Sequence, residues 1–167
     1  MTHFSTVDRG RATDFDNIED FVASAIFPAF DHPDLTDEQR AANERVVRIS
    51  REACESAIEK EWRCIFVARG EENQLAGFVI VDETNPESPE IDWLIVGPKY
   101  HGTGLAQALM TQALEHIGST REVHLTVIHY NARAIRFYEK CGFRDAGLAA
   151  TAHKIPHRLM LRAATVL

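Results

Sequence analysis

Apolar residues along this chain repeat with two periods, one typical of helices and the other of strands. A repeat near 3.6 residues predicts a helix with one apolar face, and short apolar runs bounded by polar residues or glycine predict strands. The predicted elements are, in chain order, a strand at 6–11, helices at 14–26 and 37–60, strands at 62–68, 75–81 and 90–96, a helix at 104–117, a strand at 122–128, a helix at 132–140, and two strands within 146–166 that separate near Pro156.

This order of elements predicts an α/β fold with a single mixed, mostly antiparallel sheet and helices on both faces. Thr36 and Gln39 form a capping box at the start of the second helix. Pro28 and Pro33 indicate a loop over 27–35 between the first two helices. A chain of 167 residues fits one domain, and it contains no linker, repeat or low-complexity tract, so we expect a single domain over 1–167.

Composition narrows the functional classes. Hydrophobic residues make up 45% of the chain, enough for a core, and 25 acidic against 18 basic residues give a net charge of −7, which argues against nucleic acid as the main partner. An acidic chain is compatible with a cationic amine substrate, although solubility explains the charge equally well. No apolar stretch approaches the roughly 20 residues of a membrane span, and the N-terminus has no apolar signal core.

Three cysteines, Cys54, Cys64 and Cys141, form an odd and widely spaced set. They suggest reduced thiols in a cytoplasmic protein rather than a disulfide framework. His153 and His157 are separated by three residues, but Pro156 interrupts any helix there, so no metal site is predicted.

A glycine-bearing turn between the strand at 90–96 and the following helix is the first candidate for chemistry. Gly102 and Gly104 permit positive φ and a close approach of the backbone to a ligand. The unpaired N–H groups and the dipole at a helix start favour phosphate. No Gly-Lys-Ser/Thr follows, which excludes a Walker loop, and the spacing does not fit a dinucleotide fingerprint. On turn chemistry alone, an ordinary tight connection between strand and helix is equally compatible.

A second block, LTVIHYNARAIRFYEKCGF at 125–143, changes this picture. Together the two blocks resemble the GCN5-related N-acetyltransferase (GNAT) superfamily. That family's signature, Arg/Gln-x-x-Gly-x-Gly/Ala, is matched at 101–106, with His101 in place of Arg or Gln. Its second hallmark, an Asn opening a helix that ends in Phe-Tyr-x-x-x-Gly-Phe, is matched by Asn131, Phe137, Tyr138, Gly142 and Phe143.

The resemblance implies a GNAT-like acyl-CoA N-acyltransferase fold with acetyl-CoA as cofactor. The pyrophosphate would lie over the turn at 101–106, and the pantetheine arm would pair with the backbone of the strand at 90–96. Asn131 would contact the cofactor arm, and it is also a natural helix N-cap. The cofactor-binding residues implied are Leu94, Val96, His101, Gly102, Thr103, Gly104, Leu105, Ala106 and Asn131.

Thioester aminolysis needs a neutral amine and then a proton for the leaving thiolate. The resemblance implies Tyr138 as the proton donor, which suits a phenol that stays protonated at neutral pH. Strand alternation places Glu90 and Asp92 on one face, roughly 7 Å apart. Glu90 is the preferred base because its spacing from His101 matches the glutamate of the histone-modifying branch, and Asp92 is the alternative. The opposite, apolar face of this strand is predicted to carry Ile91, Trp93 and Ile95.

The acceptor site is predicted to border the loop 27–35, as in the family. Phe30 would pack on the acceptor's apolar body, and Asp31 or Asp34 would hold a cationic group. A covalent acetyl-cysteine at Cys141 is disfavoured because the family mostly uses direct transfer.

These observations predict an acetyl-CoA-dependent enzyme that acetylates a primary amine of a small molecule by direct attack in a ternary complex. A protein N-terminus or lysine as acceptor is the first alternative, and a catalytically weak acyl-CoA-binding sensor is the second. A homodimer is compatible with the resemblance, because many relatives pair. The sequence names neither the acceptor nor the length of the acyl group.

Overall fold

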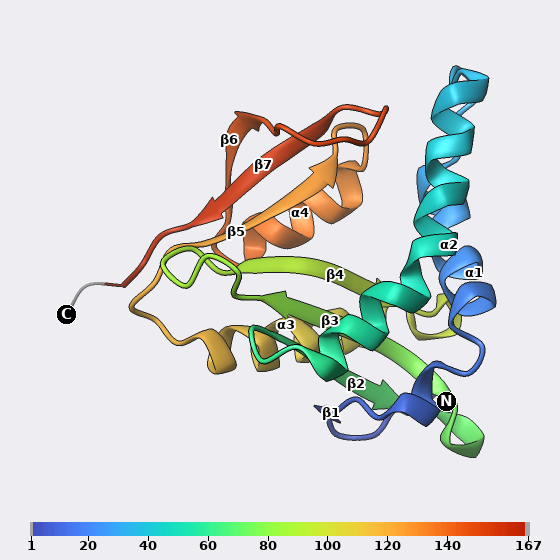
Figure 1. Cartoon of the computed structure of the whole chain (residues 1–167), viewed down its shortest axis with the longest axis vertical. Coiled ribbons are helices and arrows are strands. Elements are labelled where there is room, and N and C mark those ends of the chain that lie inside the picture. Colours follow the sequence, from blue (N-terminus) through green and yellow to red (C-terminus); the bar gives the residue numbers. More distant parts are fainter. Residues whose placement is uncertain (1, 166–167) are drawn as a thin grey trace.

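Seven strands form one sheet in the order β1-β2-β3-β4-β5-β7-β6 in the computed structural model, which describes residues 2–165 (Figure 1). The strands are β1 (Asp8–Arg9), β2 (Arg63–Arg69), β3 (Leu75–Asp82), β4 (Glu90–Val96), β5 (Val123–Ile128), β6 (Arg144–Leu148) and β7 (His157–Arg162). The α-helices are α1 (Ile18–Phe30), α2 (Asp37–Glu59), α3 (Leu105–Ile117) and α4 (Ala132–Lys140), and short 3-10 turns occupy Ala12–Phe15, Glu71–Asn73 and Pro98–Tyr100. The predicted α/β fold with one mixed sheet is confirmed.

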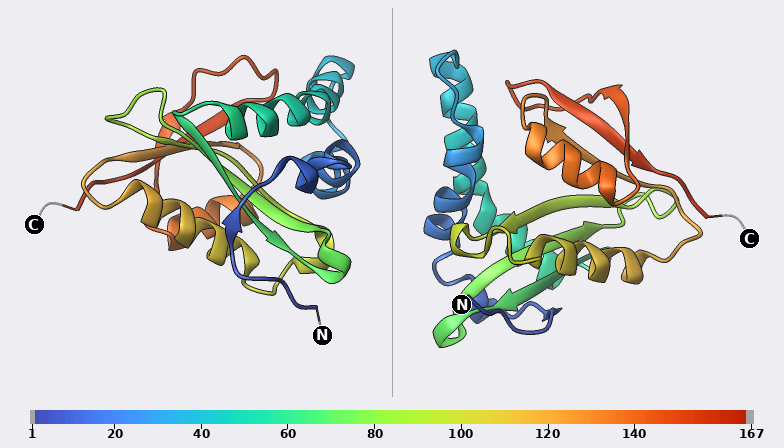
Figure 2. Two further views of the ribbon diagram at one scale, coloured as in Figure 1. Left: turned by 60° about the horizontal axis from the view of Figure 1, so that its bottom comes forward. Right: turned by 180° about the vertical axis from the view of Figure 1, so that it is seen from behind.

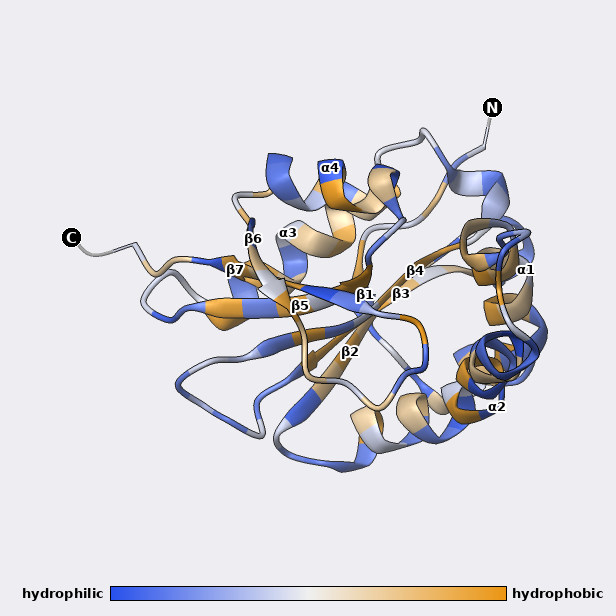
Figure 3. Cartoon of the chain, turned by 90° about the horizontal axis from the view of Figure 1, so that it is seen from above, coloured by the Kyte–Doolittle hydropathy of each residue, from blue (hydrophilic) through white to orange (hydrophobic). Residues whose placement is uncertain are grey.

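Helices cover both faces of the sheet (Figure 2). On one face α1 and α2 pack on Ile65, Val67, Phe78 and Ile80 of the strands β2 and β3. On the other face α3 and α4 pack on the alternate residues of the same strands and on β5. The alternation works because successive side chains of a strand point to opposite faces. Figure 3 shows the apolar colour concentrated on the central strands, while the outer surface of α2 is largely hydrophilic.

The sheet separates into two parts between β4 and β5. Every other neighbouring pair is antiparallel, whereas β4 and β5 run parallel and pair only at Glu90 and His124. Beyond that point the two strands diverge, so the β4 backbone from about Asp92 to Val96 has no partner strand on its β5 side. An unpaired edge inside a sheet leaves N–H and C=O groups that a ligand can use.

A β-bulge in β4 corrects one sequence-based expectation. Ile80 pairs with Trp93 and Val81 with Ile91, so Asp92 is an extra residue without a partner on β3. The bulge reverses the alternation. Ile91 consequently packs in the α3 core, whereas Trp93 and Ile95 pack against α1 and α2. The prediction that Ile91 shares a face with Trp93 and Ile95 is therefore wrong.

The first helix starts and ends later than predicted. Residues 12–15 form a 3-10 turn, because the buried Asp14 carboxylate accepts hydrogen bonds from Arg69, at 2.7 Å, and from the Arg11 N–H at 2.8 Å. At its other end α1 runs through Pro28 to Phe30, so only the last part of the predicted loop 27–35 is a loop. A proline in the last turn removes one N–H donor, while continuing the helix brings Phe30 onto the apolar core.

The other predicted helices have the ends that their capping residues indicate. Thr36 and Gln39 form the capping box of α2, Gly118 ends α3, and Asn131 caps α4. The described helices include none that is both long and apolar enough to cross a bilayer.

Candidate functional site

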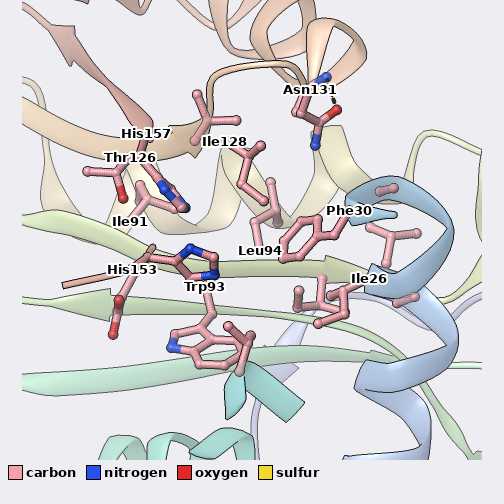
Figure 4. Close-up of a pocket in the computed structure, with 18 of the residues that line it drawn as sticks. Ile26, Phe30, Ile91, Trp93, Leu94, Thr126, Ile128, Asn131, His153 and His157 are labelled. Carbon is pink, nitrogen blue, oxygen red and sulfur yellow. Dashed lines mark hydrogen bonds between the residues drawn. The ribbon is translucent and has the colours of Figure 1, made fainter. Parts of the chain in front are cut away.

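A cavity of about 1040 Å³ opens where β4 and β5 diverge. One end is formed by the start of α3 and by Asn131, and the other by α1, α2 and the segment 151–157 that joins β6 to β7. Figure 4 shows Leu94 on the floor between the two ends, with Phe30 and Ile26 on the α1 side and His153 and His157 across the cavity. The two ends of the cavity are therefore lined by different residues and offer different chemical environments.

The turn at the start of α3 is built from backbone. Gly102 has φ +76° and Gly104 has φ +88°, conformations that L side chains rarely adopt. The N-cap Gly104 provides no side-chain cap, and the first helical hydrogen bond runs from Ala108 N–H to the Gly104 carbonyl at 3.0 Å. A Cβ atom added to either glycine would meet nothing within 4 Å. The space beside both glycines is therefore open, and the first N–H groups of α3 have no partner within the helix, as an anion site requires.

Most of the predicted cofactor residues meet at this end. The cavity lining includes Leu94, Val96, His101, Gly102, Gly104, Leu105, Ala106 and Asn131. Thr103 does not line it, because the Thr103 hydroxyl turns back and donates to the Tyr100 carbonyl. Asn131 accepts a hydrogen bond from the Ala134 N–H at 3.2 Å, and its amide nitrogen points into the cavity (Figure 4).

The two candidate base residues lie in different environments. Asp92, on the bulge, lines the cavity and accepts a hydrogen bond from Arg63 at 3.1 Å. Glu90 accepts from His124 at 3.0 Å and is not among the cavity-lining residues. That hydrogen bond raises the pKa of His124, and its other ring nitrogen lies 3.0 Å from the Ser88 hydroxyl. Glu90 thus belongs to a chain of polar contacts beside the cavity.

Burial raises the pKa of Asp92 to about 6, and the negative charge of Glu90 adds to this shift while Arg63 opposes it. The Asp92 side chain is 28% exposed and lines the cavity, so its carboxylate is partly removed from water. A carboxyl group with this pKa is ionised at neutral pH and can still accept a proton readily.

Tyr138 lines the same cavity from α4. Its ring packs edge-on against Phe137 and Phe143, with centroid distances of 5.6 and 6.2 Å. Burial raises the pKa of Tyr138 to about 12, so the phenol keeps its proton at neutral pH. The structure therefore brings the proposed proton donor and Asp92 to one cavity.

At the other end of the cavity, formed by α1, α2 and the segment 151–157 and called the acceptor end below because the sequence predicts the acceptor there, the structure separates the two residues that the sequence grouped. Phe30 lines the cavity, whereas Asp31 does not. The Asp31 side chain is 76% exposed and forms an ion pair with Arg40 at 3.4 Å.

Sequence reasoning missed two cavity-lining histidines, His153 in the segment before β7 and His157 at the first position of β7. The spacing of the pair suggests only a metal site, and Pro156 argues against one. Groups of three or more His, Cys, Asp or Glu side chains that could hold a metal ion are absent from residues 2–165. The sequence signal that could have identified the pair is its position at the start of an apolar strand. Loops and strand ends often carry functional side chains.

Comparison with known proteins gives a family. The model of the acetyltransferase (GNAT) family matches residues 25–143. Among curated proteins, spermidine N(1)-acetyltransferase of Vibrio cholerae is 31% identical over 87 residues, which is 49% of this chain and 50% of that protein. The chain thus spans about half the length of this curated relative.

Solved structures extend the similarity to the whole fold. The PaiA N-acetyltransferase of Thermoplasma acidophilum, in complex with coenzyme A, superposes with a TM-score of 0.76 over 96% of this chain and 99% of that one, at 14% identity. A candidate streptothricin acetyltransferase of Bacillus anthracis, in complex with acetyl coenzyme A, has a TM-score of 0.57 and 25% identity over 66% of this chain and 67% of that one.

Proposed function

Because this chain belongs to the acetyltransferase (GNAT) family, we propose that it transfers an acetyl group from acetyl-CoA to a primary amine of a small molecule. The observation that carries the proposal is the single cavity between the diverging strands β4 and β5. It has a backbone anion site at one end and a carboxylate and a phenol, Asp92 and Tyr138, along its walls. Transfer would be direct, with both substrates bound together.

The residues at the cofactor end fit a coenzyme A group. The open space above Gly102 and Gly104 leaves room for a pyrophosphate beside the first N–H groups of α3. The unpaired edge of β4 at Leu94 and Val96 offers backbone partners to an extended amide-bearing arm, and the amide of Asn131 faces the same space. When bound, acetyl-CoA supplies the acetyl thioester that is attacked.

Asp92 is the base that this geometry favours, in place of the Glu90 preferred from sequence. Asp92 lines the cavity, and its raised pKa of about 6 makes it a better proton acceptor than an ordinary aspartate. Glu90 acts indirectly, because its charge helps to raise that pKa. Arg63 holds the Asp92 carboxylate in place at 3.1 Å.

Tyr138 presents an O–H donor to the departing sulfur. A phenolate would be costly in this buried position, as the pKa of about 12 indicates. We therefore expect Tyr138 to regain a proton within the same turnover, and the proton that the amine releases can replace it. General acid catalysis of this kind typically contributes roughly 10²–10⁴-fold.

Cys141 is the alternative nucleophile, and its environment disfavours that role. Burial raises the pKa of the Cys141 thiol, and its sulfur lies 3.9 Å from the side-chain oxygen of Gln107 on α3. A thiol that stays protonated is a weak nucleophile. This supports direct attack by the amine.

Two contacts across the acceptor end favour a small molecule over a protein acceptor. The Tyr130 hydroxyl donates to the Phe30 carbonyl, which ties the start of α4 to α1. Lys154 pairs with Glu38 at 3.4 Å, which ties the segment before β7 to α2. Together these contacts join elements on opposite sides of the cavity, and we expect them to hinder a bulky acceptor.

The test is thiol release from acetyl-CoA with a panel of amines, combined with a thermal melt in the presence of CoA. We expect CoA to raise the melting temperature, because a ligand that binds only the native state stabilises it. We also expect at least one small amine to release thiol. Stabilisation without thiol release from any acceptor would favour the sensor alternative, and a melting curve unmoved by saturating CoA would refute the cofactor assignment.

A further inference from the structure

The strand β4 is less completely covered than its neighbours in the sheet. Nearly every residue of β2 and β3 is buried, whereas residues 93–96 of β4 are all only partly buried. All four of these residues are apolar and line the cavity, so it is the cavity that leaves them accessible. Contiguous apolar surface of this kind is typical of a binding groove.

Five large apolar side chains gather at the acceptor end of the cavity, and we call them the apolar wall. They are Phe30 of α1, Val46 and Ile49 of α2, and Trp93 and Ile95 of β4. All except Ile49 pack on the core beneath α1 and α2 and still remain only partly buried. Figure 4 shows the rings of Phe30 and Trp93, which reach this end from different elements.

An apolar wall that is open to water favours a ligand with an apolar body. Each methylene group that is removed from water strengthens binding by a factor of about four. A charged or strongly hydrated body would lose its own water here and gain no polar partner from the wall. The wall therefore selects an aromatic ring or an alkyl chain.

The charges around the cavity argue against a second ammonium group on the acceptor. The described lining residues include two acidic side chains, Glu38 and Asp92, and four that are cationic at neutral pH, Arg45, Arg48, Arg133 and Lys154. Both carboxylates already have cationic partners, since Glu38 pairs with Lys154 at 3.4 Å and Asp92 with Arg63 at 3.1 Å. A polyamine would bring further positive charge to a cavity whose lining, within residues 2–165, has no unpaired carboxylate.

We propose that the acceptor is a primary monoamine with an apolar body, either an aromatic ring or an alkyl chain, and that the apolar wall binds this body. The amino group then lies towards Asp92, which precedes Trp93 on β4 and lines the same cavity. This inference rests on the proposed acetyl transfer and narrows its substrate class. It differs from the sequence-based expectation that Asp31 or Asp34 holds a cationic group of the acceptor.

A homologous series of amines tests the contribution of the apolar body. Ethylamine, butylamine and hexylamine have amino groups of nearly the same basicity, while the alkyl chain grows. Thiol release at varied acceptor concentration gives kcat and KM for each. We expect kcat/KM to rise by about twofold to fourfold for each added methylene group, as the chain covers more of the wall.

A second set of amines tests the exclusion of further charge. Hexamethylenediamine has the same chain as hexylamine but ends in a second amino group, and spermidine is a longer polyamine. Phenethylamine represents an aromatic body. We expect kcat/KM for hexylamine and phenethylamine to exceed that for the diamine and spermidine by about tenfold or more, because a second charge would be placed against the wall without a partner.

Two matched isoleucines on α2 test where the body binds. Ile49 is 37% exposed and Ile58 is 41% exposed, but only Ile49 lines the cavity. Ile49→Gln should raise the KM for hexylamine about fivefold and flatten the rise along the amine series, with the KM for acetyl-CoA unchanged. Ile58→Gln makes the same chemical change at a similarly exposed position and should leave every KM unchanged. Because both side chains are exposed, both variants should keep the wild-type melting temperature.

The proposal is supported by a rise along the amine series and a preference for monoamines that Ile49→Gln weakens and Ile58→Gln does not. A flat series, or a preference for hexamethylenediamine or spermidine, overturns it and leaves acetyl transfer intact. Equal effects of the two variants also overturn it. Failure of every amine to release thiol overturns it as well, and the melting curve with CoA then shows whether the proposed function fails too.

Discussion

The two ends of the cavity are built in different ways. The cofactor end consists of backbone groups from consecutive residues, the turn at 101–106 and the free edge of β4. The acceptor end consists of side chains from α1, α2 and the segment 151–157, which are far apart in sequence. A backbone site constrains residue type through φ and the space that a side chain would fill, so it leaves a pattern of glycines. A side-chain site is formed by residues that only the fold brings together, so it leaves no local pattern in the sequence.

The two ends also differ in electrostatics. At the proposed cofactor end, a bound cofactor would meet the partial charges of a helix start and of peptide groups. At the acceptor end the charge states depend on burial, which raises the pKa of Asp92 and lowers those of His153 and His157. Changes at the first end should therefore abolish binding, whereas changes at the second should alter rate, pH dependence and selectivity.

The largest effect is expected from Gly104→Val. Gly104 has φ +88°, and a valine side chain would enter the open space where a pyrophosphate would lie. We expect CoA binding, measured by calorimetry, to disappear, while circular dichroism shows a folded protein. Gly118→Val is a matched control, because Gly118 at the other end of α3 has φ +85° and equally open surroundings. Equal loss of CoA affinity in both variants would contradict a specific role for the turn.

Much of the fold was predictable because local signals agree with the final structure. Caps at Thr36, Gly118 and Asn131 mark helix ends, and the glycine turn marks the proposed phosphate site. The bulge at Asp92 was not predictable, because it depends on the register between β3 and β4. The same bulge explains why Ile91 was assigned to the wrong face.

The choice of base and the acceptor side chains required the three-dimensional structure. Glu90 and Asp92 look equivalent along the strand. The structure distinguishes them, because Asp92 lines the cavity whereas Glu90 accepts a hydrogen bond from His124 beside it. Likewise Phe30 and Asp31 are neighbours in sequence, but a helix that continues past Pro28 brings only Phe30 to the cavity.

The second largest effect is expected from Tyr138→Phe. The variant keeps the ring contacts with Phe137 and Phe143 and removes only the hydroxyl. We expect kcat to fall by roughly 10²–10⁴-fold, with the melting temperature and the CoA affinity retained. If this variant keeps the full kcat and chemistry is shown to be rate-limiting, Tyr138 is not the general acid and contributes only packing.

A smaller effect, but a more specific one, is expected in the pH profile of kcat/KM. Asp92 must be ionised to accept a proton, so the wild-type rate should rise as the pH passes through about 6. Asp92→Asn should lower the rate and remove this limb, leaving only the titration of the amine. Glu90→Gln should keep the limb and move it to lower pH, because the charge of Glu90 helps to raise the pKa of Asp92. A limb that disappears in Glu90→Gln and stays in Asp92→Asn would make Glu90 the base.

The same raised pKa predicts a change in stability. A carboxyl group whose pKa is about 6 in the folded protein and near 3.8 when unfolded binds its proton more tightly in the native state. Stability is then lost as the pH rises from about 4 to 6. Asp92→Asn removes this loss and should raise the melting temperature by a few degrees at pH 7, with the difference fading below pH 4. A lower melting temperature of Asp92→Asn at pH 7 would show that the ion pair with Arg63 outweighs burial and the repulsion by Glu90.

The smallest effects are expected from the two neighbouring residues at the end of α1. Phe30 is half-buried, packs on the core beside α2 and lines the cavity, so Phe30→Ala should raise the acceptor KM about fivefold, the factor that corresponds to ~1 kcal/mol of apolar contact. It should also lower the melting temperature slightly, so the rates should be measured at a temperature well below the melting transition. Asp31→Ala removes an exposed ion pair with Arg40, a contact that contributes little, and should leave the acceptor KM unchanged. The KM for acetyl-CoA should stay constant in both variants, because neither residue belongs to the cofactor end. A larger effect from Asp31 than from Phe30 would mean that a cationic group of the acceptor binds beside Asp31, outside the cavity.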